Sequence, residues 1–206
     1  MKRIVIVDAG IGNLRSVQKA FEYVGTVPAV TDDAAVVARA DAVVLPGVGA
    51  FGDGMEGLRS RRLDVAILDA FERGILLFGI CVGLQLLFEE SEEMGTHRGL
   101  GILPGRIVRF PTSLTVPHMG WNQIEPRQAH PLLNGLPEAA FAYFAHSYHA
   151  TTDDESIVVA TTDYGGSFPS VVARDQVWAI QFHPEKSQQV GLRLLHNFVE
   201  HVADHS

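Results

Sequence analysis

A buried strand that passes into a helix with almost no connecting loop is the feature that most limits how this chain can fold. Residues 75–80 are nearly all apolar, as expected of a strand that is covered on both faces. A helix is predicted to follow at once, over residues 82–90. The turn between them must be so tight that the residues flanking its centre nearly lack side chains, and Gly79 and Gly83 meet that need. Cys81 lies at the centre of the turn.

The rest of the first half alternates between strand-like and helix-like segments. Residues 4–7 and 42–45 are short apolar runs that predict buried strands, and the second run stops at a Pro-Gly pair. Residues 14–24 and 63–71 predict helices, and each segment is soon followed by a glycine suited to cap a helix. This alternation predicts a mainly parallel sheet with helices on both faces.

The second half has a different pattern. Over residues 101–180, short strand-like runs are separated by turn signals, which predicts an antiparallel extension of the same sheet. An amphipathic helix ends the chain, with an apolar stripe over residues 190–202. We therefore expect one α/β domain over residues 1–206, built as three layers around a mixed, mainly parallel central sheet.

Composition excludes several classes of function. The chain has 206 residues and a formal net charge of −8, which argues against non-specific binding to nucleic acid and offers no basic face to anionic lipid. The longest apolar stretch, residues 75–88, is interrupted by polar residues and glycines and is too short to span a bilayer. One cysteine permits no intrachain disulfide and suits a reducing compartment. We expect a soluble cytoplasmic protein that binds neither nucleic acid nor membrane.

Cys81 is the candidate nucleophile. At the start of a helix, the dipole would favour its thiolate form, and free backbone N–H groups could stabilise an oxyanion. A lone cysteine is more often a buried structural residue. Gly79 and Gly83, together with the strand-to-helix context, favour the catalytic interpretation.

A cysteine nucleophile needs a base and a group that orients the base. His183, Pro184 and Glu185 follow a predicted strand, and the proline stiffens the link between the imidazole and the carboxylate. Glu185 could accept a hydrogen bond from one ring nitrogen and leave the other facing Cys81. Taken alone, such a pair would more often be a surface turn. A metal site is a weaker alternative, because no second cluster of potential ligands has metal-binding spacing.

Two glycine-rich segments follow strands in the first half. Over residues 45–52, glycines would let the backbone approach a substrate and turn its N–H groups inward as oxyanion donors, although an ordinary turn is the alternative. Residues 8–13 contain a Gly-X-Gly pair, but Arg15 stands where a dinucleotide-binding motif needs its third glycine. We therefore expect no cofactor.

These motifs together resemble those of class I glutamine amidotransferases. Gly79, Cys81, Gly83 and Gln85 match the family signature, and residues 183–185 match its second half. The resemblance implies the fold described above, in the form this family shares.

The resemblance is closer still to the glutaminase subunits of imidazole glycerol phosphate synthase, and it covers essentially the whole chain. Leu76, where relatives often have proline, and Ala9, where this subunit usually has tyrosine, depart from the pattern. The segments that carry the resemblance are residues 46–51, 116–122, 146–148 and 182–187.

A reaction follows from the resemblance. Cys81 would attack the side-chain amide of glutamine, and His183, oriented by Glu185, would protonate the leaving ammonia and then activate water against the thioester. Backbone N–H groups would hold the oxyanion. The residues implied to form the oxyanion and substrate sites are Gly47, Val48, Gly49, Val82, Gln85, Ser147 and Tyr148.

The resemblance also implies a partner. Ammonia would pass to a cyclase subunit with a (β/α)₈ barrel fold, in a heterodimer that makes imidazole glycerol phosphate. Surface or core packing is the alternative for each residue assigned to the contact, and aromatic side chains in particular fill cores as readily as interfaces. The residues implied to lie near the interface are Asn13, Trp121, Asn122, Tyr143 and Lys186.

Three other functions remain open from the sequence. A glutaminase subunit of another synthase, such as anthranilate synthase, is less consistent with residues 118–122. A non-catalytic regulatory subunit would not need Cys81, His183 and Glu185 together. A cysteine peptidase is the third alternative, although no segment suggests a peptide groove.

Overall fold

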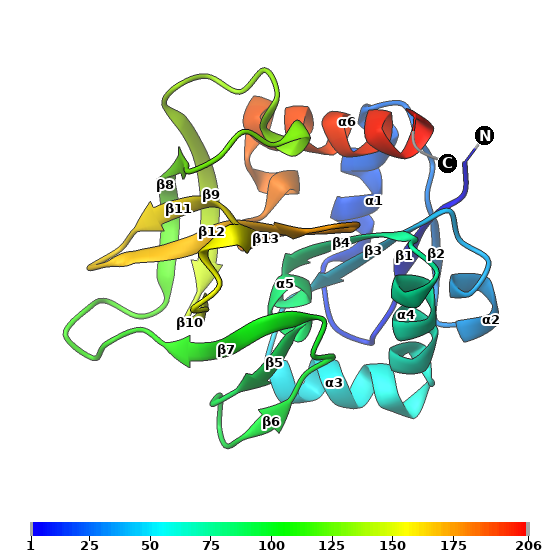
Figure 1. Cartoon of the computed structure of the whole chain (residues 1–206), viewed down its shortest axis with the longest axis horizontal. Helices are drawn as coiled ribbons and strands as arrows, with labels where there is room; N and C mark the ends of the chain where they lie inside the picture. The colour runs from blue at the N-terminus through cyan, green and yellow to red at the C-terminus, as the bar shows by residue number, and fades with distance from the viewer. Residues whose placement is uncertain (1, 205–206) are drawn as a thin grey trace.

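The structure, a computed structural model, describes residues 2–204 and contains two β-sheets (Figure 1). The strands of the larger sheet are β1 (Ile4–Val7), β2 (Ala29–Thr31), β3 (Ala42–Gly47), β4 (Leu76–Cys81), β8 (His118–Pro126), β9 (Ala140–His146), β11 (Val158–Asp163), β12 (Ser167–Arg174) and β13 (Val177–Ile180). The strands of the smaller sheet are β5 (Phe88–Ser91), β6 (His97–Arg98), β7 (Leu103–Arg109) and β10 (Tyr148–Thr151).

The larger sheet is parallel on one side and antiparallel on the other. Its strands lie in the order β2-β1-β3-β4-β13-β12-β11-β8-β9. Neighbours from β2 to β13 run parallel, whereas neighbours from β13 to β9 run antiparallel. This mixed sheet, with helices on both faces, confirms the α/β fold class predicted from the sequence.

Helices cover both faces of the larger sheet. In Figure 1, α1 and α6 lie on one side of it and α3 and α4 on the other; the helices are α1 (Leu14–Tyr23), α2 (Ala34–Val37), α3 (Phe51–Ser60), α4 (Leu63–Glu72), α5 (Val82–Leu86) and α6 (Gln188–Asp204), with short 3₁₀ turns η1 (Pro131–Leu133), η2 (Glu155–Ile157) and η3 (Pro184–Lys186). Phe198 of α6 ties this layer to the sheet, because its ring stacks on Phe78 of β4 at 4.7 Å and meets Phe21 of α1 at 6.0 Å.

Most elements predicted for the first half are confirmed near their predicted bounds. The strand over residues 4–7 is fully buried, as its apolar run predicted. The helices α1 and α4 begin at the predicted residues and end within one residue of the prediction. The apolar stripe predicted for the last helix faces the core through Leu194, Leu195 and Phe198.

The helix predicted over residues 82–90 is wrong in its second half. The helix α5 ends at Leu86, and Phe88 begins the strand β5, which pairs with β6 and β7. The Leu87 carbonyl accepts hydrogen bonds from the backbone N–H groups of Ile102 and Leu103. Pairing with a distant segment therefore overrides the local helical pattern.

The antiparallel region predicted over residues 101–180 is confirmed only in part. Strands β8, β9, β11 and β12 extend the larger sheet, but β7 and β10 belong to the smaller one. The strand predicted over residues 42–45 also continues through Pro46 and Gly47. Proline is tolerated there because Pro46 pairs with β4 only, beyond the last residue that β1 reaches.

The helix α3 was not predicted, because its glycines are typical of a loop. Two of them are required by packing rather than by flexibility. A Cβ on Gly54 would lie 2.8 Å from Ile11 Cδ1, and a Cβ on Gly57 would overlap the Ala9 carbonyl. These glycines let α3 press against the loop that follows β1.

One continuous cluster of buried apolar side chains extends from β1 to α6 and includes residues of both sheets. A single domain over residues 1–206 stays a prediction that is consistent with this shared core. None of the helices within residues 2–204 combines the length and apolar character needed to cross a membrane.

Candidate active site

Cys81 ends β4 and directly precedes α5, so the chain turns from strand to helix at this residue. Its backbone has φ 55° and ψ −112°, a conformation that residues with side chains rarely adopt. A Cβ on Gly79 would lie 2.9 Å from the Gly83 carbonyl oxygen, and a Cβ on Gly83 would overlap the Leu45 carbonyl. Both glycines are therefore needed for the turn that presents the Cys81 thiol at the carboxyl end of β4.

The imidazole of His183 reaches the same place from the neighbouring strand. β13 runs parallel to β4, with Ile180 opposite Ile80. Because the carboxyl ends of parallel neighbours meet at one edge of a sheet, the segment after β13 carries His183 toward Cys81. His183 Nδ1 lies 3.0 Å from Glu185 Oε1, and the two side chains are only 3% and 2% exposed. The structure thus brings together the residues predicted as nucleophile, base and orienting group.

Burial alone would lower the pKa of His183. Hydrogen bonds to Cys81 and Glu185, together with the negative charges of the same two residues, outweigh burial and raise the pKa to about 10. The imidazole is therefore a cation near neutral pH. A cation beside a thiol favours the thiolate, which is the nucleophilic form of cysteine.

Backbone contacts hold the turn that carries His183. Its N–H donates to the Tyr143 carbonyl at 2.9 Å, which ties the turn to β9. The Ser187 hydroxyl donates to the His183 carbonyl at 2.6 Å and accepts from the Tyr143 N–H at 2.9 Å. Ser187 is 1% exposed, so it fixes the turn from inside the protein, a role that the sequence did not indicate.

Two buried glutamines connect Cys81 to the second sheet. Gln85 Nε2 donates to the Tyr148 carbonyl at 2.9 Å and to Gln181 Oε1 at 3.2 Å. Gln181 Nε2 in turn lies 3.9 Å from Cys81 Sγ. This chain of contacts orients both amides and makes a polar wall beside the thiol.

A pocket of about 170 Å³ opens beside the thiol of Cys81. It is smaller than the roughly 300–1,000 Å³ typical of sites for drug-sized ligands, and so suits an amino acid better than a peptide. Of the residues predicted for substrate or oxyanion binding, the pocket is lined by Val48, Gly49, Val82, Gln85, Ser147 and Tyr148, and its other lining residues are Glu93, Pro117, Met119, Ala145 and His146.

The predicted oxyanion loop lies close to the start of α5. A Cβ on Gly47 would lie 2.9 Å from Val82 Cβ and 3.2 Å from the Gly83 nitrogen, so only glycine permits this approach. Gly49 has φ +113° in open space, a backbone conformation that an L side chain strains. The backbone on both sides of Val48 is therefore set by glycines.

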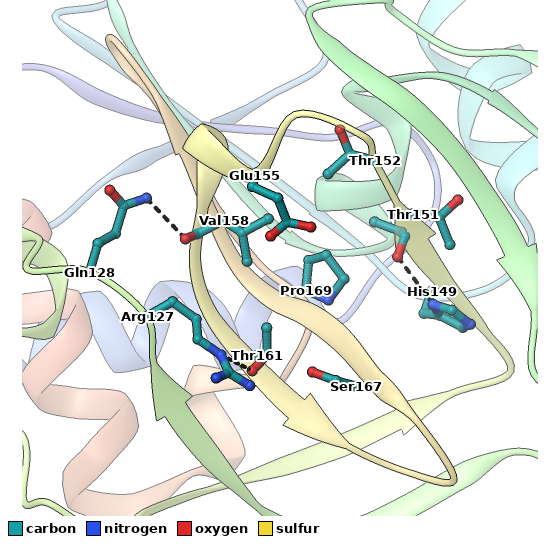
Figure 2. A pocket seen from close by; sticks show the side chains of 11 residues that line it. Arg127, Gln128, His149, Thr151, Thr152, Glu155, Val158, Thr161, Ser167 and Pro169 are labelled. Carbon is teal, nitrogen blue, oxygen red and sulfur yellow. Dashed lines mark hydrogen bonds between the residues drawn. The ribbon is translucent and has the colours of Figure 1, made fainter.

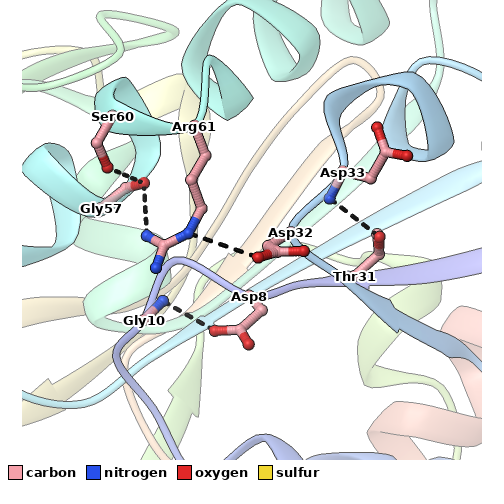
Figure 3. A network of polar contacts seen from close by, with 8 residues as sticks. All are labelled: Asp8, Gly10, Thr31, Asp32, Asp33, Gly57, Ser60 and Arg61. Atoms are coloured by element: carbon pink, nitrogen blue, oxygen red, sulfur yellow. Dashed lines mark hydrogen bonds and ion pairs between the residues drawn. The ribbon is translucent and has the colours of Figure 1, made fainter.

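The loop that follows β1 packs against this oxyanion loop. A Cβ on Gly12 would lie 3.6 Å from Gly47 Cα. Arg61, just after α3, fixes the far side of the loop: its guanidinium lies beside Gly10 and forms an ion pair with Asp32 at 3.7 Å (Figure 3). The pair is partly exposed, so its contribution is geometric more than energetic.

The residues predicted for a partner interface fall into two groups. Trp121 is 48% exposed and meets Tyr143 edge to face at 6.2 Å, and Lys186 Nζ lies 5.6 Å from the Tyr143 ring. Asn13 is exposed at the start of α1, which packs against η3. The side chain of Asn122 lies on the other face of β8, where its Nδ2 lies 3.2 Å from His118 Nε2 and donates to the Asp163 carbonyl at 2.8 Å.

A larger pocket, of about 590 Å³, lies between β10, β11 and β12 (Figure 2). Arg127 crosses its rim and donates to the Thr161 hydroxyl at 2.8 Å. Hydroxyl and amide groups line it, and it contains neither the cysteine nor the His183–Glu185 pair. The small pocket beside Cys81 is therefore the candidate active site.

Sequence reasoning missed three residues at the site. Gln181 contacts Cys81 from two residues before His183, a position that an alternating strand pattern would have pointed inward. Glu93 is the carboxylate of the pocket lining and accepts from the Phe51 N–H at 2.7 Å. His146 also lines the pocket; it belongs to the segment 146–148 that carries the family resemblance, but only its neighbours Ser147 and Tyr148 were assigned to the site.

Known proteins share both the sequence pattern and the fold. Residues 5–202 match the family described as "Glutamine amidotransferase class-I". A crystal structure titled "Crystal structure of glutamine amidotransferase" superposes with a TM-score of 0.77 at 22% identity, over 97% of this chain and 98% of that one. The structure of PurLQS from Thermotoga maritima superposes with a TM-score of 0.77 at 21% identity, over 98% and 100%. The chain belongs to the class I glutamine amidotransferase family, which confirms the resemblance predicted from the sequence.

Curated relatives are more similar still in sequence. A protein of Syntrophotalea carbinolica, named imidazole glycerol phosphate synthase subunit HisH, is 57% identical over 202 residues, which cover 95% of this chain and 98% of the relative. A Salinibacter ruber protein of the same name is 54% identical over 200 residues, which cover 94% and 92%.

The raised pKa of His183 predicts how stability depends on pH. Because the folded-state value of about 10 lies above the unfolded value of 6.5, protonation stabilises the fold fully below about pH 6.5. This contribution is lost as pH rises toward and through about 10. Urea unfolding at a series of pH values should show the wild type losing stability relative to His183→Gln across this window.

Cys81→Ser is the matched control, because Cys81 is one cause of the raised pKa. In the Cys81→Ser background, the pH dependence of stability should differ less between proteins with and without His183. A difference should remain, because Glu185 still raises the pKa of His183. Parallel pH profiles for the wild type and His183→Gln would contradict a cationic His183.

Proposed function

We propose that the chain is the glutaminase subunit of imidazole glycerol phosphate synthase. It hydrolyses glutamine to glutamate and ammonia and supplies the ammonia to a cyclase subunit. The observation that carries this proposal is the position of Cys81, on a strained turn beside the buried His183–Glu185 pair. The relatives named as subunits of this synthase support the choice of the partner reaction.

In the first half of the reaction, the Cys81 thiolate attacks the amide carbon of the glutamine side chain. The tetrahedral oxyanion accepts hydrogen bonds from the backbone N–H of Val82, at the start of α5, and from the Val48–Gly49 segment. His183 then gives its proton to the amide nitrogen, the carbon–nitrogen bond breaks and ammonia leaves. A thioester remains on Cys81.

The second half uses the same groups with the proton moving the other way. His183, now neutral, takes a proton from a water molecule as the water oxygen attacks the thioester carbon. The new tetrahedral intermediate collapses to the Cys81 thiolate and the side-chain carboxylic acid, which releases its proton to water to give glutamate, and His183 is again a cation. Glu185 keeps Nδ1 engaged at 3.0 Å throughout, so Nε2 faces the reacting atoms.

The pocket suits the rest of the glutamine molecule. Gln85, Ser147 and Tyr148 line it and offer polar groups to the substrate. The carboxylate of Glu93 complements an α-ammonium group, which every free amino acid carries. A free amino acid is therefore a better match than an internal residue of a peptide.

The cyclase subunit, with its (β/α)₈ barrel, docks on the face formed by Trp121, Tyr143 and Lys186, with Asn13 at its edge. Trp and Tyr are enriched at protein interfaces, and here the exposed Trp121 ring meets the half-buried Tyr143 ring edge to face. The heterodimer acts in the cytoplasm, where reducing conditions keep the Cys81 thiol free.

Cys81→Ala should abolish synthesis of imidazole glycerol phosphate from glutamine when the chain is mixed with its cyclase partner. Synthesis from added ammonium salt should persist, because ammonia bypasses the glutaminase reaction. His183→Ala should behave like Cys81→Ala, whereas Glu185→Gln should retain measurable turnover, because Glu185 only orients the imidazole.

Each rate is compared with that of the wild-type complex at equal partner occupancy. If Cys81→Ala keeps more than about a hundredth of the glutamine-dependent rate, Cys81 is not the nucleophile. Loss of ammonium-dependent synthesis as well would mean that the substitution disrupts the complex.

Gly49→Ala tests the oxyanion loop. The methyl group has open space, but φ +113° is strained for alanine, so the peptide between Val48 and Gly49 is pushed out of its present orientation. Loss of one oxyanion donor costs on the order of 10²–10³ in kcat. We expect kcat of the partner-stimulated glutaminase to fall by that factor with little change in KM for glutamine.

Gly74→Ala is the control, because Gly74 also has a positive φ and open space but lies at the end of α4, away from the pocket. It should cost stability and leave kcat near the wild-type value. Full partner-stimulated turnover in Gly49→Ala would exclude this peptide as an oxyanion donor.

A further inference from the structure

Two buried imidazoles connect β8 to the wall of the pocket. His118 and His146 face each other directly in the register of β8 and β9, and they are 4% and 6% exposed. His118 Nδ1 lies 3.0 Å from His146 Nε2. Beyond this pair, Asn122 Nδ2 lies 3.2 Å from His118 Nε2, and His146 Nδ1 lies 2.8 Å from the Tyr148 carbonyl oxygen. The four groups form one continuous chain of hydrogen bonds.

The Asn122 end of the chain has a fixed direction. Its Oδ1 accepts from the Gln123 N–H at 2.8 Å, and its Nδ2 donates to the Asp163 carbonyl at 2.8 Å. These contacts fix which end of the amide is nitrogen, so Nδ2 is also the donor to His118. His118 Nε2 must then be a bare acceptor, and the proton of the neutral ring must lie on Nδ1.

The Tyr148 end requires the same direction independently. A backbone carbonyl can only accept, so His146 Nδ1 must carry a proton. His146 Nε2 is then free to accept from His118 Nδ1, which is the proton position that Asn122 demands. Both ends of the chain therefore agree on one arrangement, in which each ring is neutral and protonated on Nδ1.

A second proton on either ring would break the chain. A proton on His146 Nε2 would face the Nδ1–H of His118, and a proton on His118 Nε2 would face the Asn122 amide hydrogens. The surroundings favour neutrality as well: His118 stacks on Tyr164 at 4.0 Å and on Phe144 at 4.9 Å, with no carboxylate in contact with either ring among residues 2–204.

Burial lowers the pKa of His118 to about 4 and that of His146 to about 3. The hydrogen bond to Tyr148 opposes the effect on His146, while the titratable groups that face it, His118, His149 and His183, add to it. The chain of neutral rings is thus stable at the pH where the enzyme works.

The chain of hydrogen bonds ends on the carbonyl oxygen of Tyr148, a residue that lines the pocket. The Tyr148 carbonyl accepts from His146 and also from Gln85, whose second amide hydrogen goes to Gln181 beside Cys81. Tyr148 begins β10, where the backbone leaves the larger sheet for the smaller one. The His146 hydrogen bond therefore adds to the backbone pairing with β7 that holds this crossing, and it fixes the carbonyl that orients the Gln85 amide.

We propose that His118 and His146 are positioning residues for the glutamine pocket, acting as two neutral Nδ1–H donors in series that hold the Tyr148 carbonyl and, through it, Gln85. The proposal rests on the proposed function, since it takes this pocket to be the glutamine site. Neither imidazole touches the reacting atoms.

The test measures alkylation of Cys81 by iodoacetamide, with and without glutamine. The rate without glutamine reports the reactivity of the thiol. The glutamine concentration that halves this rate, called half-protection below, reports how tightly the pocket binds glutamine. In His146→Leu, the Tyr148 carbonyl loses its donor, and half-protection should need about tenfold more glutamine, the effect of one lost hydrogen bond. The rate without glutamine should change by less than about twofold, because the Cys81–His183–Glu185 set is untouched.

Two variants separate positioning from loss of packing. His146→Asn places an amide nitrogen near the position of Nδ1 and should restore most of the glutamine protection. His149→Leu removes the imidazole in β10, whose ring centroid lies 4.5 Å from that of Phe110 and whose Nδ1 lies 3.1 Å from the Ala150 carbonyl oxygen, outside the chain of hydrogen bonds. It should leave half-protection at the wild-type value.

Unchanged half-protection in His146→Leu would overturn the proposal, and so would equal losses in the unprotected rate and in protection, which indicate general disruption. A wild-type protein that iodoacetamide alkylates but glutamine does not protect would contradict the proposed function instead.

Proton–nitrogen NMR correlations of the wild type test the chain of hydrogen bonds independently, because they report the tautomer and charge of each ring. Both rings should be neutral Nδ1–H tautomers between about pH 6 and 8, and Nε2–H or charged rings would overturn the proposal.

Discussion

The backbone of Cys81 is held at a positive φ that it would not adopt alone, and the site depends on that constraint. A φ of 55° at a residue with a side chain costs on the order of 1–3 kcal/mol, which the surroundings must offset. They do so through contact: Gly79 presses on the start of α5 and Gly83 on the Leu45 carbonyl. The parallel neighbours β3 and β13 then deliver the oxyanion loop and His183 to the same edge of the sheet.

Imidazoles near Cys81 are held in opposite protonation states by their neighbours. His183 has a carboxylate and a thiol as partners, which raise its pKa despite burial. His118 and His146 have only aromatic rings, an amide and a carbonyl, so burial keeps them neutral. One group can therefore move protons during the reaction, while the other two serve as fixed hydrogen-bond donors that hold the pocket wall.

Local patterns predicted the elements whose structure is decided locally. The two glycines around Cys81 indicated the turn, and the buried strand over residues 4–7 followed from its apolar run. The helix predicted over residues 82–90 is wrong in its second half because Phe88 pairs with β7, a contact between distant segments that no local pattern contains. Gln181 meets Cys81 across a hundred residues of sequence, and Asn122 turns inward because strand register, not residue type, decides its face.

Trapping the thioester on Cys81 tests most directly whether this residue is the nucleophile. During turnover of the wild-type complex with isotope-labelled glutamine, acid quenching should trap the acyl group before water hydrolyses the thioester. Peptide mapping by mass spectrometry should then find the glutamyl group on the peptide that contains Cys81, and no such adduct in Cys81→Ala. A glutamyl group on any other residue, or glutaminase turnover without one, would contradict Cys81 as the nucleophile.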